Sequence, residues 1–359
     1  MEIKKDRNSN IEALRIVAMF MILMLHVNFY SLGEPSTEES ITNPLPTFGR
    51  CFFESISLIS VNLFVLISGW FSIKFTLKRL AAFVFQSIYI ITTIYLIGLV
   101  LGYATIDEKQ IKECLFMAWY GWFIRAYIGL MILSPILNYF VEYASKKIFM
   151  LVLICFFTFQ TFYACFTTSA TFIDRGYSTF SFIGLYLLAR YIRLYGKAII
   201  KKAELLSIIA FLGYVAWGYL PVRFGVMRIF YMSMWYTNPF NVALAISVLL
   251  LAAKMRPHTN KIINYVAAST FTVYLCHMCN TWTAHLYKTV SIGIYNTYSG
   301  ITYLTAITAF IVTVFIVSII FDQPRKWLWY KISRATLPPP LLTVINNDRM
   351  QFYYLSCNH

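Results

Sequence analysis

Long apolar runs alternate with short polar segments from residue 11 to residue 321. A helix needs about 20 apolar residues to cross a bilayer, and the runs have about that length. The polar segments between them are too short to form a soluble domain. The pattern therefore predicts an all-α, polytopic membrane helix bundle of about ten transmembrane helices, at residues 11–31, 53–73, 80–103, 122–143, 148–167, 178–195, 204–220, 231–253, 262–281 and 297–321.

The composition supports a membrane protein. The chain is 59% hydrophobic and only 13% charged, whereas soluble domains contain about 25% charged residues. One membrane domain, residues 1–334, is expected to occupy most of the chain and to be embedded in the lipid bilayer. Residues 335–359 form a tail with three consecutive prolines and no membrane pattern, and we assign it no function.

The net charge of +15 is explained by membrane topology. With the N-terminus inside, 20 Lys and Arg residues fall in cytoplasmic segments and seven in outer segments. An excess of Lys and Arg in short loops marks the cytoplasmic side. Both termini are therefore predicted to be cytoplasmic, and no nucleic-acid partner is needed to explain the charge.

The first predicted span contains three ionisable residues, Glu12, Arg15 and His26. At 100° per residue, Arg15 and His26 lie about 20° apart around a helix and about 16 Å apart along it. Glu12 lies one turn before Arg15, close enough to pair with it. Because a charge in hydrocarbon costs several kcal/mol, we expect this stripe to face the bundle interior or water.

Two structural interpretations compete with a catalytic one. Arg15 alone could extend along the helix to the membrane interface, and His26 could be a hydrogen-bonded core residue. However, an imidazole titrates near neutral pH and can accept a proton from a hydroxyl group. The sequence contains no G-x-S-x-G motif, so a general base without a protein nucleophile is the simplest catalytic scheme.

Four motifs occur in order along the chain and together resemble the acyltransferase-3 family of integral membrane acyltransferases. Bacterial members of that family often O-acetylate surface polysaccharides. The motifs are an R-x10-H pair in IEALRIVAMFMILMLH (11–26), VNLFVLISGWF (61–71), WFIRAYIGLMILSPILN (122–138) and STFTVYLCH (269–277).

This resemblance implies that Arg15 and His26 are the functional pair, with His26 in the transfer chemistry. It also implies a cytoplasmic acyl-CoA donor, such as acetyl-CoA, no bound cofactor, and a glycan or lipid-linked sugar as acceptor. The expected location is the bacterial cytoplasmic membrane. The family often ends its last span in Glu-x-Pro, whereas FDQPRKW (321–327) has Asp322, which puts a catalytic role for this carboxylate in doubt.

Three further polar residues have both a structural and a functional interpretation. Ser68, next to Gly69, could serve close helix packing or line the channel for the acyl donor. Glu54 could be solvated or could orient an imidazolium at His26. Arg125 could be an interfacial anchor or could contact substrate or Glu54.

Two clusters also have alternative interpretations. Cys276, His277, Cys279 and His285 lack the spacing of a zinc site, so we predict no metal and expect His277 to line the interior cavity. The run RYIRLYGKAIIKK (190–202), with Arg190, Arg193 and Lys197, could be a topology signal or could bind the phosphates of acyl-CoA.

A transporter or flippase is the competing function. In that case Arg15 and His26 would form an ion or proton relay. The number of spans suits a transporter, but the chain has no internal repeat of the kind found in many secondary transporters.

Overall fold

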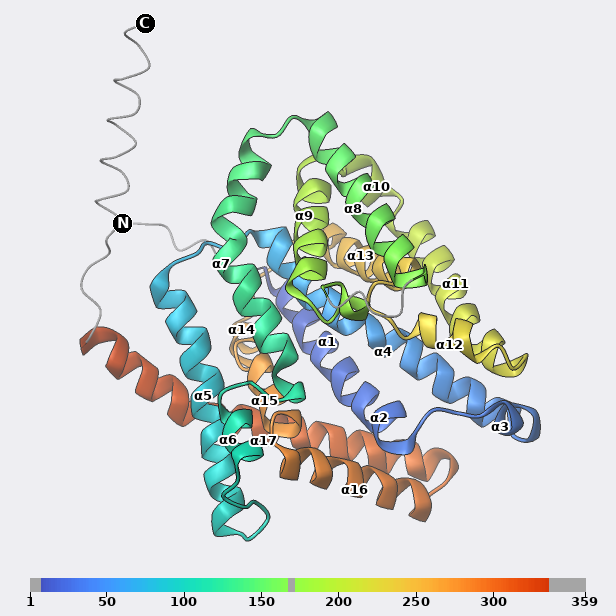
Figure 1. Ribbon diagram of the computed structural model, residues 1–359, viewed down its shortest axis with the longest axis vertical. Coiled ribbons are helices and arrows are strands. Elements are labelled where there is room, and N and C mark those ends of the chain that lie inside the picture. Colours follow the sequence, from blue (N-terminus) through green and yellow to red (C-terminus); the bar gives the residue numbers. More distant parts are fainter. Residues whose placement is uncertain (1–7, 167–171, 336–359) are drawn as a thin grey trace, which may run out of the picture.

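The computed structural model describes residues 8–166 and 172–335, and this part of the chain is helical with no strand (Figure 1). The prediction of an all-α membrane bundle is confirmed. The longer helices are α1 (Ser9–Val27), α4 (Pro44–Phe71), α5 (Leu77–Val100), α7 (Trp122–Tyr143), α8 (Lys146–Phe166), α9 (Thr179–Tyr195), α11 (Ala203–Arg223), α13 (Pro239–Lys254), α15 (Thr270–Met278), α16 (Thr281–Thr297) and α17 (Gly300–Ala335).

Shorter elements connect these helices. They are α2 (Phe29–Leu32), α3 (Thr37–Thr42), α6 (Glu108–Cys114), α10 (Lys197–Lys201), α12 (Met227–Ser233) and α14 (Lys261–Ala267), with 3-10 turns η1 (Trp119–Gly121) and η2 (Asp174–Gly176). The predicted tail, from residue 336 onward, and residue 167 of the fifth predicted span lie outside the described residues.

Seven helical segments of the described chain are long and apolar enough to cross a membrane, and eight if the bent segment α14 to α16 counts as one span. The other two predicted spans correspond to α9 and α13, with 17 and 16 residues. Both are shorter than the roughly 20 residues that cross a bilayer. The count of ten and the cytoplasmic location of the termini therefore stay predictions.

One predicted span begins later than the apolar pattern indicates. The predicted span 231–253 is broken between α12 and α13, because Asn238 caps α13 by accepting from the backbone N–H of Phe240 at 2.8 Å, and Pro239 follows as the first helical residue. The break leaves residues 234–238 outside a helix. Tyr236, in this stretch, faces the cavity described below.

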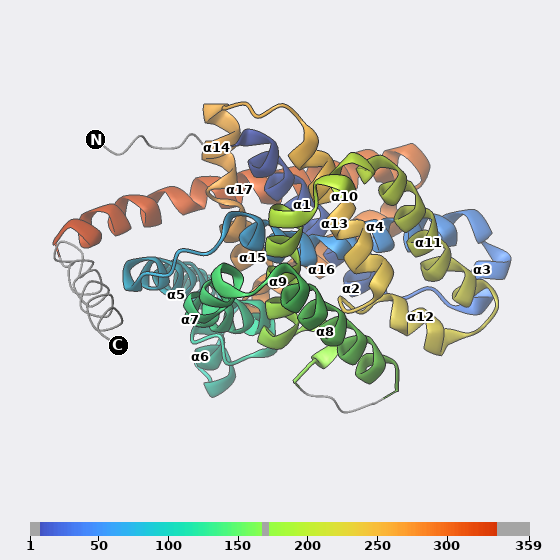
Figure 2. The ribbon, with the colours of Figure 1, turned by 90° about the horizontal axis from the view of Figure 1, so that it is seen from above.

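Helix α4 is at the centre of the bundle. In its most apolar stretch 72% of the residues are buried, against 39% or less in the other six candidate spans. It packs against α1, α9, α11 and α13, and Figures 1 and 2 show α1 and α4 side by side, with α5, α8 and α11 farther out.

Gly69 allows the close approach of α4 and α9. A Cβ atom at this position would lie 2.5 Å from the backbone oxygen of Tyr186 and 2.9 Å from the Cβ of Ala189. Only a residue without a side chain avoids this clash, as is common where membrane helices approach closely. Close packing therefore accounts for the glycine of the predicted Ser68–Gly69 pair.

A sharp bend separates α15 from α16. The two segments meet at 86°, with residues 279 and 280 between them. Buried Glu113, from α6, holds the first turn of α16 because its carboxylate accepts from the backbone N–H of Thr281 at 3.0 Å and from the Thr281 hydroxyl. Backbone groups freed by the bend are thus satisfied by protein, and the bend fixes the end of α15.

Candidate active site

A cavity of about 620 Å³ runs along α1. Arg15, Met19, Ile22 and His26 all line it, so the polar stripe predicted from helical periodicity faces the bundle interior. Eleven residues of α-helix separate the two ends of this stripe by about 16 Å. We call these the Arg15 end and the His26 end of the cavity.

The Arg15 end combines one ion pair with polar and aromatic side chains. Nη1 of Arg15 donates to both carboxylate oxygens of Glu12, at 2.9 and 3.0 Å. The Glu12 side chain is only 6% exposed, whereas that of Arg15 is 29% exposed, which leaves part of the guanidinium open to the cavity. The same end is lined by Ser68, Phe83, Gln86, Tyr127, Ala267 and Ala268.

Ser68 lines the cavity and is hydrogen-bonded. Its hydroxyl donates to the backbone oxygen of Phe64 at 2.9 Å. A serine has one hydroxyl proton, so the Tyr127 hydroxyl, also at 2.9 Å, is the donor to Ser68. Ser68 therefore holds Tyr127 in the cavity wall between α4 and α7, a position that suits the predicted donor channel.

At the His26 end, the imidazole of His26 is paired with a second histidine. Nδ1 of His26 lies 2.9 Å from Nε2 of His277 on α15. His277 is 3% exposed, and its Nδ1 lies 2.6 Å from the backbone oxygen of Val273. The residues that line the cavity include His26 but not His277. The expectation that His277 lines the cavity is therefore wrong, because it lies behind His26.

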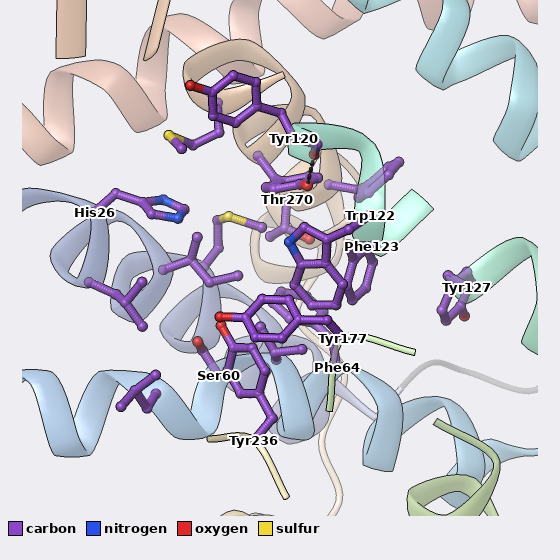
Figure 3. Close-up of a pocket in the computed structure, with 18 of the residues that line it drawn as sticks. His26, Ser60, Phe64, Tyr120, Trp122, Phe123, Tyr127, Tyr177, Tyr236 and Thr270 are labelled. Carbon is purple, nitrogen blue, oxygen red and sulfur yellow. Dashed lines mark hydrogen bonds between the residues drawn. The ribbon is translucent and has the colours of Figure 1, made fainter. Parts of the chain in front are cut away.

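Aromatic side chains from separate segments frame the space in front of His26. Figure 3 shows the His26 imidazole turned toward Trp122 and Tyr177, with Tyr236 beside Tyr177. The Trp122 and Tyr177 ring centroids are 4.5 Å apart, and those of Tyr177 and Tyr236 are 4.9 Å apart. Burial raises the pKa of the Tyr177 phenol, so this hydroxyl stays protonated near neutral pH. Trp119, Tyr120 and Tyr30 complete this aromatic group.

Two polar side chains of α4 face the same space. Glu54 is 4% exposed and accepts from Asn28 Nδ2 at 3.0 Å and from the backbone N–H of Phe29 at 3.4 Å. It is therefore buried in the cavity wall and is not a solvated surface residue. Ser60 is fully buried, and its Oγ has no hydrogen-bond partner among the described residues.

Arg125 and Asp322 lie outside the cavity lining. Exposed Arg125 donates to the backbone oxygens of Phe116 and Ala118, and so fastens the segment before α7. Asp322 is fully buried and pairs with Arg325 at 2.8 Å. It also accepts from the Thr272 hydroxyl at 2.8 Å, so its observed contacts join α17 to α15.

The basic run near α9 and α10 also lies outside the cavity lining. Exposed Arg193 lies over the Trp70 ring at 4.7 Å, and Lys197 is exposed at the start of α10. Half-buried Arg190 has an Nε without a partner among the described residues. Arg193 thus contacts the end of α4 that follows Ser68. A role of these cations in binding phosphates stays a prediction.

Ser60 and the aromatic group were not predicted from the sequence. Trp122 begins α7, Tyr177 follows η2, and Tyr236 precedes α13. These residues are not on one helix, so no helical periodicity relates them. The available signal was the position of Trp and Tyr at helix ends.

In the part of the chain that the structure describes, no group of three His, Cys, Asp or Glu residues could hold a metal ion.

Comparison with known protein families gives one match. A model described as an acyltransferase domain matches residues 8–322, which is most of the chain, and confirms the resemblance carried by the four motifs. Searches of curated proteins and of solved structures found no match. The matched region includes every residue of the cavity wall.

Proposed function

The chain belongs to the acyltransferase-3 family and is a multi-pass membrane acyltransferase, and we propose that it transfers an acyl group from acyl-CoA to a glycan hydroxyl. One observation carries the proposal: a single cavity is lined by Arg15 at one end and His26 at the other. We further propose that the acyl group is acetyl, and that the acceptor is a lipid-linked or cell-surface glycan at the bacterial cytoplasmic membrane.

The Arg15 end suits the donor. A guanidinium binds phosphate and other anionic groups strongly, and the Arg15 side chain is only partly occupied by Glu12. Arg15 and His26 are about 16 Å apart along α1, a distance comparable to the length of an extended pantetheine arm. The thioester of a donor held near Arg15 would therefore reach the imidazole. Apolar side chains of Met19, Ile22 and Phe64 line the path between them.

The His26 end suits a sugar acceptor. Aromatic rings such as those of Trp122 and Tyr236 offer flat apolar faces for the C–H face of a sugar ring. Carboxylates accept hydrogen bonds from hydroxyl groups, and Glu54 is in the wall. The hydroxyl of Ser60 has no partner among the described residues and is fully buried in the wall, whereas buried polar atoms are nearly always paired. We propose that a local movement of the wall on acceptor binding exposes this hydroxyl to a ligand hydroxyl.

The proposed reaction uses His26 as general base. The imidazole accepts the proton of the sugar hydroxyl while the sugar oxygen attacks the thioester carbonyl. A C–O bond forms, the C–S bond breaks, and the imidazolium returns the proton to the CoA thiolate. A variant of this scheme passes through a transient acyl-histidine. Arg15 is too far along the helix to touch the reacting carbonyl, so its role is to hold the donor.

The test is transfer by the purified protein in lipid nanodiscs. With acetyl-CoA and a glycan acceptor, we expect free CoA to be released together with acetylated glycan. The His26→Ala variant should lower the rate by about 10²- to 10⁴-fold, the usual contribution of general acid–base catalysis. His285→Ala is the matched control, because His285 is exposed and does not line the cavity.

Two results would contradict the proposal. Acetyl transfer that His26→Ala leaves unchanged would remove this imidazole as the base. Solute uptake into vesicles without any acyl donor would favour the transporter alternative, which family membership does not support. Mass analysis of host glycans, with and without the protein, would identify the acceptor.

A further inference from the structure

The hydrogen bonds of His277 determine which of its nitrogen atoms carries a proton. Its Nδ1 lies 2.6 Å from the backbone oxygen of Val273. A carbonyl oxygen only accepts, so Nδ1 of His277 is the donor. A neutral imidazole has one donor and one acceptor nitrogen. Nε2 of His277 is then the acceptor, provided that the ring is neutral.

The surroundings of His277 favour the neutral ring. The residue is 3% exposed, and no carboxylate among the described residues bonds to it. A buried charge without a partner is costly. The Tyr287 ring packs against the imidazole with centroids 5.2 Å apart, and the Tyr287 hydroxyl donates to the backbone oxygen of Leu23 on α1 at 2.8 Å. His277 is therefore held against the helix that carries His26.

The same logic extends to His26. Its Nδ1 lies 2.9 Å from the acceptor nitrogen of His277, so Nδ1 of His26 must donate. When the His26 ring is neutral, this leaves its Nε2 without a proton, on a ring that lines the cavity (Figure 3). We propose that His277 is a positioning residue that fixes His26 in the Nδ1-protonated tautomer, with Nε2 free to accept a proton from the acceptor hydroxyl.

The arrangement orients the base but does not relay protons. The hydrogen-bond chain runs from His26 to His277 and ends on the Val273 carbonyl, which cannot pass a proton onward. In the active site of serine proteases, an aspartate plays the same part by holding the catalytic histidine in one tautomer. When His26 becomes an imidazolium, its bond to His277 becomes charge-assisted and therefore stronger. The catalytic consequence rests on the proposed function, whereas the tautomer does not.

Nitrogen-15 NMR of the full-length protein in bilayers tests the tautomer directly. The chain has five histidines, and a His26→Gln variant identifies the His26 signals. We expect His26 to show a protonated Nδ1 and an unprotonated Nε2. In His277→Leu, the His26 signals should shift toward the Nε2-protonated tautomer. In His277→Gln, the amide oxygen can take the place of Nε2 and should preserve the original tautomer.

Kinetics provide an independent measurement. If the proposed function holds, His277→Leu should lower kcat at least about tenfold, with KM for acetyl-CoA within about twofold, and His277→Gln should recover most of kcat. A wild-type His26 protonated at Nε2, or a tautomer that His277→Leu leaves unchanged, would overturn the inference. Because NMR needs no turnover, failure of the proposed function would be seen separately, as absent transfer with the expected tautomer.

Discussion

The Arg15 guanidinium donates to both oxygens of the Glu12 carboxylate from a single nitrogen, Nη1. The ion pair holds the Arg15 side chain in place. Because no second nitrogen of the guanidinium takes part in this pair, the other nitrogens remain donors for a ligand. The Arg15 end of the cavity therefore carries a positively charged guanidinium that is already oriented before a substrate binds.

Replacement of Arg15 by Gln should weaken binding of the donor. We expect KM for acetyl-CoA to rise about tenfold or more, with a smaller change in kcat, because a charged hydrogen bond contributes about 1.5–3 kcal/mol. Initial-rate kinetics at varied acetyl-CoA would measure both constants. Exposed Arg223, at the end of α11 and outside the cavity lining, supplies the control variant Arg223→Gln. Equal effects of the two variants would show that the overall charge, not this site, binds the donor.

Removal of the unpaired hydroxyl in Ser60→Ala should impair acceptor binding without loss of stability. The free protein loses an unsatisfied buried group, so its melting temperature should stay constant or rise. KM for the glycan should rise severalfold, because a ligand hydroxyl would lose its partner. Ser55→Ala is the matched control: Ser55 Oγ is also buried and unpaired among the described residues, but it packs near Gly218 and does not line the cavity. An unchanged KM in Ser60→Ala would place the acceptor elsewhere.

Gly69→Ala should destabilise the bundle. The new Cβ would meet the Tyr186 backbone oxygen at 2.5 Å, so α4 and α9 would have to separate. Overpacking of this kind costs about 1–3 kcal/mol, which a thermal-unfolding assay in detergent would detect as a lower melting temperature. In the control, Gly293→Ala, the added Cβ meets no atom within 4 Å and should gain helix propensity. If both variants melt alike, the close approach at Gly69 is not a stabilising contact.

Asp322→Asn should act on stability more than on chemistry. It would leave the buried Arg325 without its carboxylate, and breaking a buried pair from one side costs about 3–5 kcal/mol. Thermal unfolding should therefore occur at a clearly lower temperature, while the folded fraction keeps most of its kcat. A second change, Arg325→Leu, should restore part of the lost stability. Loss of kcat by more than about 10²-fold in fully folded Asp322→Asn protein would instead assign the carboxylate to catalysis.

Local periodicity was sufficient to predict the central element of the site. Arg15 and His26 are on one helix, so 100° per residue placed both on the same face before any tertiary contact was known. Their shared cavity follows from that face being buried. The number of spans was harder to predict, because α9 and α13 are short for a bilayer and lie against other helices.

The partner of His26 depends on a contact between residues that are distant in the sequence. His277 is 251 positions away along the chain, and only the packing of α15 against α1 brings the two rings together. The motif that contains His277 indicated its importance, but not that it would lie behind His26. The same limit explains the aromatic group, whose members come from three separate segments, and Arg125, whose acceptors are backbone oxygens that no sequence pattern marks.

The bend after α15 connects the short surface helix α6 to the position of His26, the proposed base. His277 lies two residues before the bend, and the first turn of α16 is anchored by Glu113 of α6. Sequence changes around Glu113 would therefore tilt the end of α15 and alter the His26 to His277 distance without touching either ring. In engineered variants, exchange of residues 103–118, none of which lines the cavity, offers a way to adjust the basicity of His26 while the cavity wall stays intact.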